Sequence, residues 1–365
     1  MAEVNRIGLR KLWFQVHKWI GLLLAILIIP LSLSGSALVW HDWLDETVNP
    51  GRYAVSDPGL LLAPSAYLAS ARRVLGEGHR ISMIRYPEHG GPIIVNAVKP
   101  VEGAPARKNV WIDPATARVL DAAGGNEGLV RVLHNLHGNL LVPGVGRQIV
   151  GWLGVAMLLS ALSGLWLWWP AIGRWTRGLR WKRARNFDTN LHHQMGFWIA
   201  IPLGMLSFTG IWISFPLFFA ALSGSAGDQQ RTLRFRATPV EAPRLTADAA
   251  MAIAGKSKPV SIAWPTDKDP SWRISLARGG EVRIDDATGE RSSSARSGGS
   301  QGPARLMRRL HDGTGMGPVW QTIIFIGGIL PAGLAVTGII MWARARRWRG
   351  DLANRRQGRA AVETV

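Results

Sequence analysis

Four long segments of this chain contain no aspartate, glutamate, lysine or arginine, and this feature restricts the possible folds more than any other. The segments cover residues 19–40, 148–173, 194–227 and 313–342. Each is long enough for a helix across a hydrocarbon core of about 30 Å, which takes roughly 20 residues. We therefore predict a membrane α-helical protein with four transmembrane helices.

The positions of the apolar segments predict the order of the parts. The predicted transmembrane helices cover residues 19–41, 147–173, 192–219 and 316–343. The predicted parts outside the membrane are a cytoplasmic N-terminus 1–18, a first periplasmic domain 42–146, a basic cytoplasmic loop 174–191, a second periplasmic domain 220–315 and a cytoplasmic tail 344–365.

The basic residues support this orientation. Segments 1–18, 174–191 and 344–365 hold 17 basic and four acidic residues, which supply +13 of the formal net charge of +19. Because positively charged loops stay on the cytoplasmic side, we expect a multi-pass protein with both termini in the cytoplasm. This charge flanks membrane spans, so membrane lipids, and not nucleic acid, are the expected partners of the basic segments.

The chain also aligns with itself, in register at four histidines. The aligned positions are His17 with His192, Ser34 and Gly35 with Thr209 and Gly210, His137 with His311, and Ser163 and Gly164 with Thr337 and Gly338, at shifts of 175 and 174 residues. The sequence therefore predicts two internal repeats. The small residues of the Ser-Gly and Thr-Gly pairs permit close helix packing and also open space for a porphyrin.

The candidate site residues are the four aligned histidines, His17, His192, His137 and His311. An ionisable side chain at the border of a membrane span is costly and is by default a functional candidate. His17 and His192 begin apolar helices at the predicted cytoplasmic face, whereas His137 and His311 precede apolar helices at the opposite face. The alternative role for such a histidine is to reach the lipid headgroups.

Paired histidines in a membrane are suited to hold a haem iron as its axial ligands. We predict one haem between His17 and His192 and a second between His137 and His311. The chain has no cysteine, which excludes thiolate-ligated haem and cysteine-held iron–sulfur clusters.

His134 and His41 are the alternative iron ligands at the external face. His134 lies one helical turn before His137 and is placed to replace it or to bind a haem propionate. His41 ends the first predicted span, but its partner in the repeat is Pro216, which cannot bind iron.

The two external segments share strand and helix patterns. Strand patterns occur at 81–85, 92–98, 109–120, 261–264, 272–276 and 281–290. Helices are expected at 63–75 and 246–255, so each segment is predicted to be a small α+β domain. Arg273, Arg278 and Arg283 are candidate contacts for an anionic acceptor.

Several motifs combine along the chain. They are the Ile-Asp-x-x-Thr patterns at 112–116 and 284–288, the His-x-x-x-Gly openings at His17 and His192, the Leu-x-x-Leu-His-Gly run that ends at Gly138, the Ser-Gly and Thr-Gly pairs, and the tryptophan-rich end at 166–170. This set resembles the PepSY-associated transmembrane proteins from about residue 16 to about residue 349. The resemblance implies that the two external segments are extracytoplasmic PepSY-like domains.

The better-understood members of that family resemble bacterial inner-membrane ferric-siderophore reductases, which carry b-type haem and serve iron uptake. The resemblance implies an inner-membrane oxidoreductase with haem b that reduces a ferric siderophore or another periplasmic acceptor. No Gly-x-Gly-x-x-Gly motif follows a strand and opens a helix, so the electron donor is expected to be separate, either a quinol or a reductase. The alternatives are a non-enzymatic sensor or scaffold and a siderophore transporter, although transporters commonly have polar or broken helices at the midplane.

Overall fold

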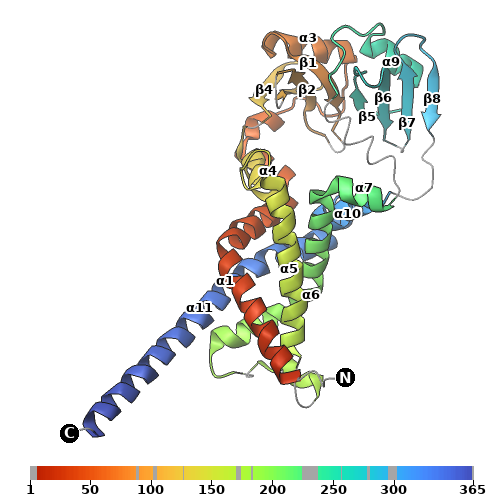
Figure 1. The fold of residues 1–365 in the computed structure, drawn as a ribbon. Coiled ribbons are helices and arrows are strands. Elements are labelled where there is room, and N and C mark those ends of the chain that lie inside the picture. Colours follow the sequence, from red (N-terminus) through yellow and green to blue (C-terminus); the bar gives the residue numbers. More distant parts are fainter. Residues whose placement is uncertain are drawn as a thin grey trace. The chain divides into compact units, whose positions relative to one another are not determined.

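The chain forms two compact units in the computed structural model (Figure 1). The structure describes residues 6–87, 90–101, 105–125, 127–169, 174–181, 184–223, 237–255, 257–277, 280–294 and 302–363. The helical unit comprises Met1–Trp40, Leu133–Phe219 and Ala304–Val365, and the sheet unit comprises His41–Val132 and Ala220–Pro303. Arg278 and Pro170, which the sequence singles out, lie outside the described residues.

Four long apolar helices build the helical unit. They are α1 (Arg6–Val39), α5 (Gly146–Trp168), α6 (Phe187–Ser214) and α11 (Gly317–Glu363). Each contains a segment long and apolar enough to cross a membrane, which confirms the predicted number of spans within the described residues. Both α1 and α6 pack against α5 and α11. Apolar side chains such as Ile26 and Ile201 stay exposed, as lipid-facing positions do, and the chain is a multi-pass membrane protein.

Three of these helices extend beyond their predicted bounds. α1 begins at Arg6, so His17 lies well inside the helix and not at its start. α6 begins at Phe187, one turn before His192, and α11 continues through the basic tail. The predicted bounds mark the apolar spans, and the helices continue past them because arginine and lysine are good helix formers and do not end a helix.

Short helices connect the spans. They are α4 (Leu129–Asn139), η2 (Trp175–Leu179), α7 (Pro216–Ser223) and α10 (Pro303–Asp312). α4 carries His137 and α10 carries His311. The turn after α4 places Leu140 and Leu141 in the left-handed region, at φ values of 54° and 60°, which is unfavourable for residues other than glycine.

The sheet unit contains one antiparallel sheet of eight strands. They are β1 (Arg80–Arg85), β2 (Ile93–Lys99), β3 (Ala106–Ile112), β4 (Val119–Gly124), β5 (Pro259–Ala263), β6 (Ser271–Leu276), β7 (Glu281–Asp285) and β8 (Arg291–Ser294). Their order is β4-β3-β2-β1-β5-β6-β7-β8. The helices of this unit are α2 (His41–Val48), η1 (Pro50–Tyr53), α3 (Pro64–Val74) and α9 (Ala247–Ala254).

One hydrophobic core lies between the sheet and its two covering helices, α3 and α9 (Figure 1). Tyr67 of α3, Ala250 of α9, Ile84 of β1 and Trp272 of β6 are fully buried in this core. Buried and less buried residues alternate along β2, β6 and β7, as expected for a sheet with one face on a core.

The two external segments contribute four strands each to this sheet. Residues 83–85 of β1 pair with residues 261–263 of β5, which joins the two sets of strands. The predicted strands and helices occur, but the segments do not form two separate α+β domains as the sequence patterns suggested. The physical reason is that β1 and β5 would otherwise be edge strands with unpaired main-chain N–H and C=O groups.

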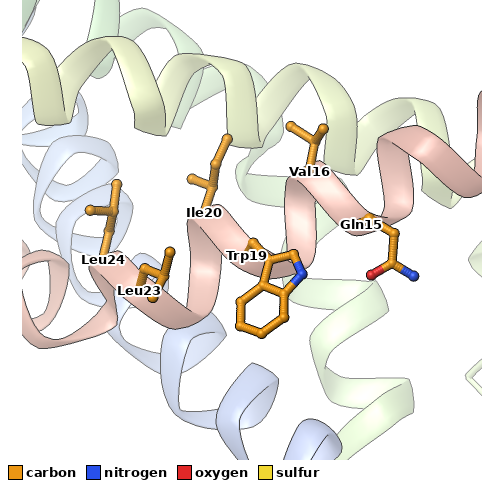
Figure 2. A pocket seen from close by; sticks show the side chains of 6 residues that line it. All are labelled: Gln15, Val16, Trp19, Ile20, Leu23 and Leu24. Carbon is orange, nitrogen blue, oxygen red and sulfur yellow. The ribbon is translucent and has the colours of Figure 1, made fainter.

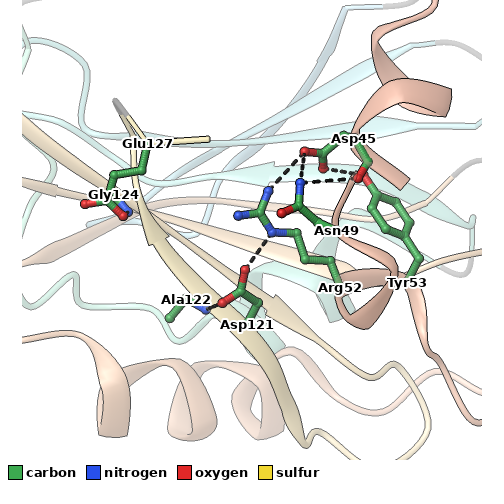
Figure 3. A network of polar contacts seen from close by, with 8 residues as sticks. All are labelled: Asp45, Asn49, Arg52, Tyr53, Asp121, Ala122, Gly124 and Glu127. Atoms are coloured by element: carbon green, nitrogen blue, oxygen red, sulfur yellow. Dashed lines mark hydrogen bonds and ion pairs between the residues drawn. The ribbon is translucent and has the colours of Figure 1, made fainter. Parts of the chain in front are cut away.

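A network of charged groups ties the segment after α1 to β4 in the sheet unit (Figure 3). The Arg52 guanidinium donates from Nη1 to Asp45 at 3.0 Å and from Nε to Asp121 at 2.6 Å. It also lies over the ring of Trp111, 4.1 Å from the ring centre. The Tyr53 hydroxyl donates to the other oxygen of the Asp45 carboxylate at 2.7 Å. The Arg52 side chain is only 9% exposed, and its charge is balanced by the carboxylates of Asp45 and Asp121.

Candidate functional site

His17 of α1 and His192 of α6 form the first histidine pair. Their ring centres are 6.5 Å apart and their ring planes are at 85° to one another. Nδ1 of His17 lies 3.1 Å from Oγ of Ser163 on α5, and Nδ1 of His192 lies 2.9 Å from Oγ1 of Thr337 on α11. Oγ of Ser160, also on α5, lies 3.4 Å from the same nitrogen of His17, so all four spanning helices contribute polar side chains to this pair.

His137 of α4 and His311 of α10 form the second pair. Their ring centres are 6.0 Å apart, with 39° between the planes. Nδ1 of His137 lies 2.8 Å from the main-chain oxygen of Leu31 on α1. Nδ1 of His311 lies 3.1 Å from the main-chain oxygen of Leu206 and 2.9 Å from Oγ1 of Thr209, both on α6. The structure therefore brings together the same two pairs that the sequence repeat predicts.

The two pairs lie at opposite ends of the spanning helices. On α6, the first pair contributes His192 and the second contacts Thr209. At a rise of about 1.5 Å per residue, these positions are about 25 Å apart along the helix. A hydrocarbon core is about 30 Å thick, so the two pairs are near its two faces.

The hydrogen bonds of the second pair identify the protonated ring nitrogen. A carbonyl oxygen can only accept, so the Nδ1 atom of His137 must donate to Leu31. The same applies to His311 and the carbonyl of Leu206. A neutral histidine with its proton on Nδ1 has a free lone pair on Nε2, and this is a form that binds metals.

The hydroxyl groups beside the first pair, those of Ser163 and Thr337, indicate the same protonation state for His17 and His192. The single proton of the Thr337 hydroxyl is shared between the carbonyls of Gly333 at 2.8 Å and Leu334 at 3.1 Å, and that of Ser163 is donated to the carbonyl of Ser160 at 3.2 Å. Each hydroxyl can then only accept from the histidine beside it. We therefore assign the proton to Nδ1 in all four histidines, which leaves every Nε2 free.

Each histidine ring also lies against a glycine. A Cβ atom added at any of these glycines would lie close to Cε1 of the histidine. The distances are 3.1 Å for Gly164 and His17, 3.7 Å for Gly338 and His192, 2.5 Å for Gly35 and His137, and 3.3 Å for Gly210 and His311. The residue before each glycine is a buried serine or threonine. We call the four pairs, Ser34 with Gly35, Ser163 with Gly164, Thr209 with Gly210 and Thr337 with Gly338, the histidine seats.

The donor set fits a haem iron. Two imidazoles that bind one metal from opposite sides, each at a metal–nitrogen distance of about 2 Å, have ring centres roughly 6 Å apart. The observed distances are 6.5 and 6.0 Å. A porphyrin supplies four ligands of its own, so two histidines complete the coordination. Among the described residues, no group of three or more His, Cys, Asp or Glu is placed to hold a bare metal ion.

The alternative ligands of the external face lie elsewhere. His134 is on α4 with His137, but its side chain is exposed, and it is His137 whose ring lies beside His311. His41 begins α2 in the sheet unit, where it is exposed and 3.2 Å from Asp42. Of the predicted anion contacts, Arg273 and Arg283 lie opposite one another on β6 and β7, and each pairs with a nearby carboxylate.

A shallow apolar groove of about 450 Å³ runs along α1 (Figure 2). Its lining comes entirely from α1 and consists of Gln15, Val16, Trp19, Ile20, Leu23 and Leu24. Gln15 is the single polar residue of this lining. A groove of this composition on a spanning helix is suited to lipid acyl chains.

Comparison with known families identifies the relatives of this chain. The PepSY-associated TM region matches residues 14–345. The chain belongs to this family. All four histidines and all four histidine seats of this PepSY-associated protein lie inside the matched region. No curated protein matches the chain.

Sequence reasoning found the histidines of this PepSY-associated protein but missed the function of the seats. The Ser-Gly and Thr-Gly pairs were interpreted as sites of helix packing or as space for a porphyrin. In the structure, each glycine leaves room for an imidazole ring. The hydroxyl of the seat, or a main-chain carbonyl one turn before it, accepts a hydrogen bond from Nδ1 of that ring. The self-alignment matches seats with seats and histidines with histidines, so it identifies the seats as repeated but does not say which histidine each one holds.

Proposed function

We propose that this protein is a haem b protein of the bacterial inner membrane that transfers electrons across the membrane to ferric-siderophore iron in the periplasm. His17 and His192 are the proposed axial ligands of one haem, and His137 and His311 those of a second. The observation that carries the proposal is the presence of two histidine pairs at iron-bridging distance, each ring held through Nδ1 with Nε2 free.

The residues of the chain have separate tasks in this proposal. Bound haem iron supplies one-electron chemistry. The four histidines hold the iron, and the groups that accept from Nδ1 orient each ring and raise its basicity. The apolar helices around the pairs lower the local dielectric constant, which helps to set the reduction potential.

The separation of the two pairs supports transfer across the membrane. They are about 25 Å apart along α6, so two sites divide the thickness of the hydrocarbon core into shorter steps. By the distribution of basic residues, the first pair is at the cytoplasmic face and the sheet unit is in the periplasm. The proposed acceptor is a ferric siderophore or another periplasmic oxidant, and the proposed donor is a separate quinol or reductase.

The first test is the visible spectrum of the purified protein. A reduced-minus-oxidised spectrum of b-type haem, with two haems per chain, is the expected result. A colourless but folded preparation from haem-replete cells would overturn the proposal. That outcome would favour a non-enzymatic sensor or scaffold.

The second test concerns the direction of electron transfer. In right-side-out vesicles with the donor system restored, an impermeant ferrous chelator outside should trap iron(II), and His192→Ala should abolish the trapping. Trapping only by a chelator enclosed in the vesicles would contradict the proposed direction and favour siderophore transport.

A further inference from the structure

The two histidine pairs are held by different chemical groups. In the first pair, the hydrogen-bond partners of both Nδ1 atoms are side-chain hydroxyls. They are Ser163 at 3.1 Å and Ser160 at 3.4 Å for His17, and Thr337 at 2.9 Å for His192. In the second pair, a main-chain carbonyl is the partner of His137 and one of the two partners of His311. The seat hydroxyl of Ser34 donates to the Leu31 carbonyl at 3.0 Å, the same carbonyl that accepts from His137.

This difference has a chemical consequence for the ring nitrogens. A hydrogen bond from Nδ1–H to an acceptor pushes electron density toward Nε2 and makes the imidazole a stronger donor to a metal. A main-chain carbonyl is fixed by the helix and cannot be removed by a side-chain substitution. A hydroxyl acceptor is a side chain and can be removed by a single substitution. The electronic character of the first pair therefore depends on replaceable hydroxyl residues, of which Thr337 and Ser163 lie nearest to their histidines.

The hydroxyl of Thr337 also has a fixed orientation. It donates to the carbonyls of Gly333 and Leu334, at 2.8 and 3.1 Å, so its lone pairs point away from its own helix toward His192. Thr337 is 6% exposed, so water does not readily replace the hydroxyl as an acceptor. The Leu334 carbonyl, 3.1 Å from the same hydroxyl, is a candidate substitute acceptor.

We infer that Ser163 and Thr337 are positioning residues that set the reduction potential and haem affinity of the His17–His192 site. In the His137–His311 site, main-chain carbonyls set these two properties. The inference rests on the proposed function, because it concerns the haem held by these histidines. It adds that the two sites are tuned by different means. One is adjustable by mutation of a hydroxyl, and the other is fixed by the helix backbone.

The chain offers two matched pairs of substitutions as a test. Thr337→Val and Thr209→Val remove the same hydroxyl from equivalent seats, but only His311 keeps a hydrogen bond to a carbonyl, that of Leu206, after the change. Ser163→Ala and Ser34→Ala form the second comparison, because His137 keeps its bond to Leu31. Thr337→Ser retains the hydroxyl and is the rescue variant.

The measurements are haem content and a potentiometric titration of the full-length protein in detergent. Thr337→Val and Ser163→Ala should each move one of the two midpoint potentials to a more positive value, because a weaker imidazole donor stabilises ferric iron less. Their haem affinity at that site should fall about 10-fold or more. Thr209→Val should move the other potential by less, Ser34→Ala should leave it in place, and Thr337→Ser should restore the wild-type titration.

The outcomes separate this inference from the proposed function. A wild-type protein without haem would overturn the proposed function and with it the inference. A wild type with two haems, combined with equal shifts in Thr337→Val and Thr209→Val, would overturn the inference alone, because it would mean that the Leu334 carbonyl replaces the hydroxyl. If Thr337→Val loses haem entirely, the Ser163→Ala titration decides the result.

Discussion

Gly35 of α1 is so close to His137 of α4 that a Cβ atom at this position would lie 2.5 Å from Cε1 of the ring. Carbon atoms that are not bonded do not approach to this distance, so the ring occupies the space that a side chain would need. The position of His137 therefore depends on the absence of a side chain on the neighbouring helix. The same relationship is weaker at Gly338, where the distance to His192 is 3.7 Å, an ordinary contact.

We predict that Gly35→Ala displaces His137 and causes loss of the haem at the second pair, whereas Gly338→Ala keeps both haems. Helix propensity cannot explain the expected loss, since alanine is more favourable than glycine in a helix by about 1 kcal/mol. Haem content per chain, determined on the two purified variants, is the measurement. Two haems in Gly35→Ala would show that the ring is free to move aside.

A second prediction concerns the assignment of ligands to sites. His17→Ala and His192→Ala should remove the same haem, and His137→Ala and His311→Ala should remove the other, because each pair shares one iron in the proposal. A double substitution within a pair should have little more effect than either single one. His134→Ala is the control, since that side chain is exposed and should leave haem content unchanged. Loss of haem in this control, with retention in His137→Ala, would reverse the assignment.

The angles between ring planes predict two different electron paramagnetic resonance signals. Perpendicular imidazoles donate into two different iron d orbitals and keep them close in energy, whereas rings nearer to parallel split them. The first pair is at 85° and the second at 39°. The oxidised protein should therefore show one strongly axial low-spin signal, absent in His192→Ala, and one more rhombic signal, absent in His311→Ala. Two identical signals would contradict this prediction.

The sequence predicts those features of the fold that depend on composition and local pattern. The spans follow from four segments without charge, and strands β1 to β7 and helices α3 and α9 of the sheet unit lie within a few residues of their expected positions, whereas α2, η1 and β8 were not predicted. The pairing of His17 with His192 follows from the self-alignment. These features are local or repeated, so they leave a signal in a single sequence.

Contacts between distant segments leave no such signal. Ser163 and His17 are 146 residues apart in the chain, and the sequence around either residue does not indicate their contact. The pairing of β1 with β5 was missed for the same reason, since alternation identifies a strand and its buried face but not its neighbour in the sheet. α1 starts before the predicted span, because charge marks the membrane border and not the helix end.

A fourth prediction concerns the stability of the sheet unit. Arg52→Ala should lower the free energy of unfolding of this unit by about 3 kcal/mol, because it leaves the carboxylates of Asp45 and Asp121 without their cation. Arg283→Ala is the matched control. Its ion pair with Glu281 is about 40% exposed on both sides, and such a pair contributes about 1 kcal/mol or less. Hydrogen exchange of peptides from the sheet, in full-length protein, measures both effects. Equal effects would mean that the Arg52 network adds no stability beyond that of a surface pair.

The last prediction concerns pH. Asp113, at the turn between β3 and β4, is 1% exposed. Burial raises the pKa of this carboxyl, but hydrogen bonds from the Ser56 hydroxyl at 2.7 Å, the Thr116 hydroxyl and the Ala115 amide outweigh burial, and the net pKa lies below its ordinary value. A lowered pKa in the folded state stabilises the protein above the unfolded pKa of about 4, and this contribution is lost as the pH falls through the folded pKa.

Ser56→Ala removes one of these donors and should destabilise the sheet unit by about 1–2 kcal/mol at pH 7. The difference from wild type should shrink below about pH 4, where the carboxyl of the variant and then that of the wild type become protonated. Thr288→Ala, which removes a hydroxyl from Asp285 at the turn between β7 and β8, should have a smaller effect at every pH because Asp285 is less buried than Asp113. A Ser56→Ala difference that stays constant from pH 7 to pH 3 would show that the hydroxyl acts through packing and not through the charge of Asp113.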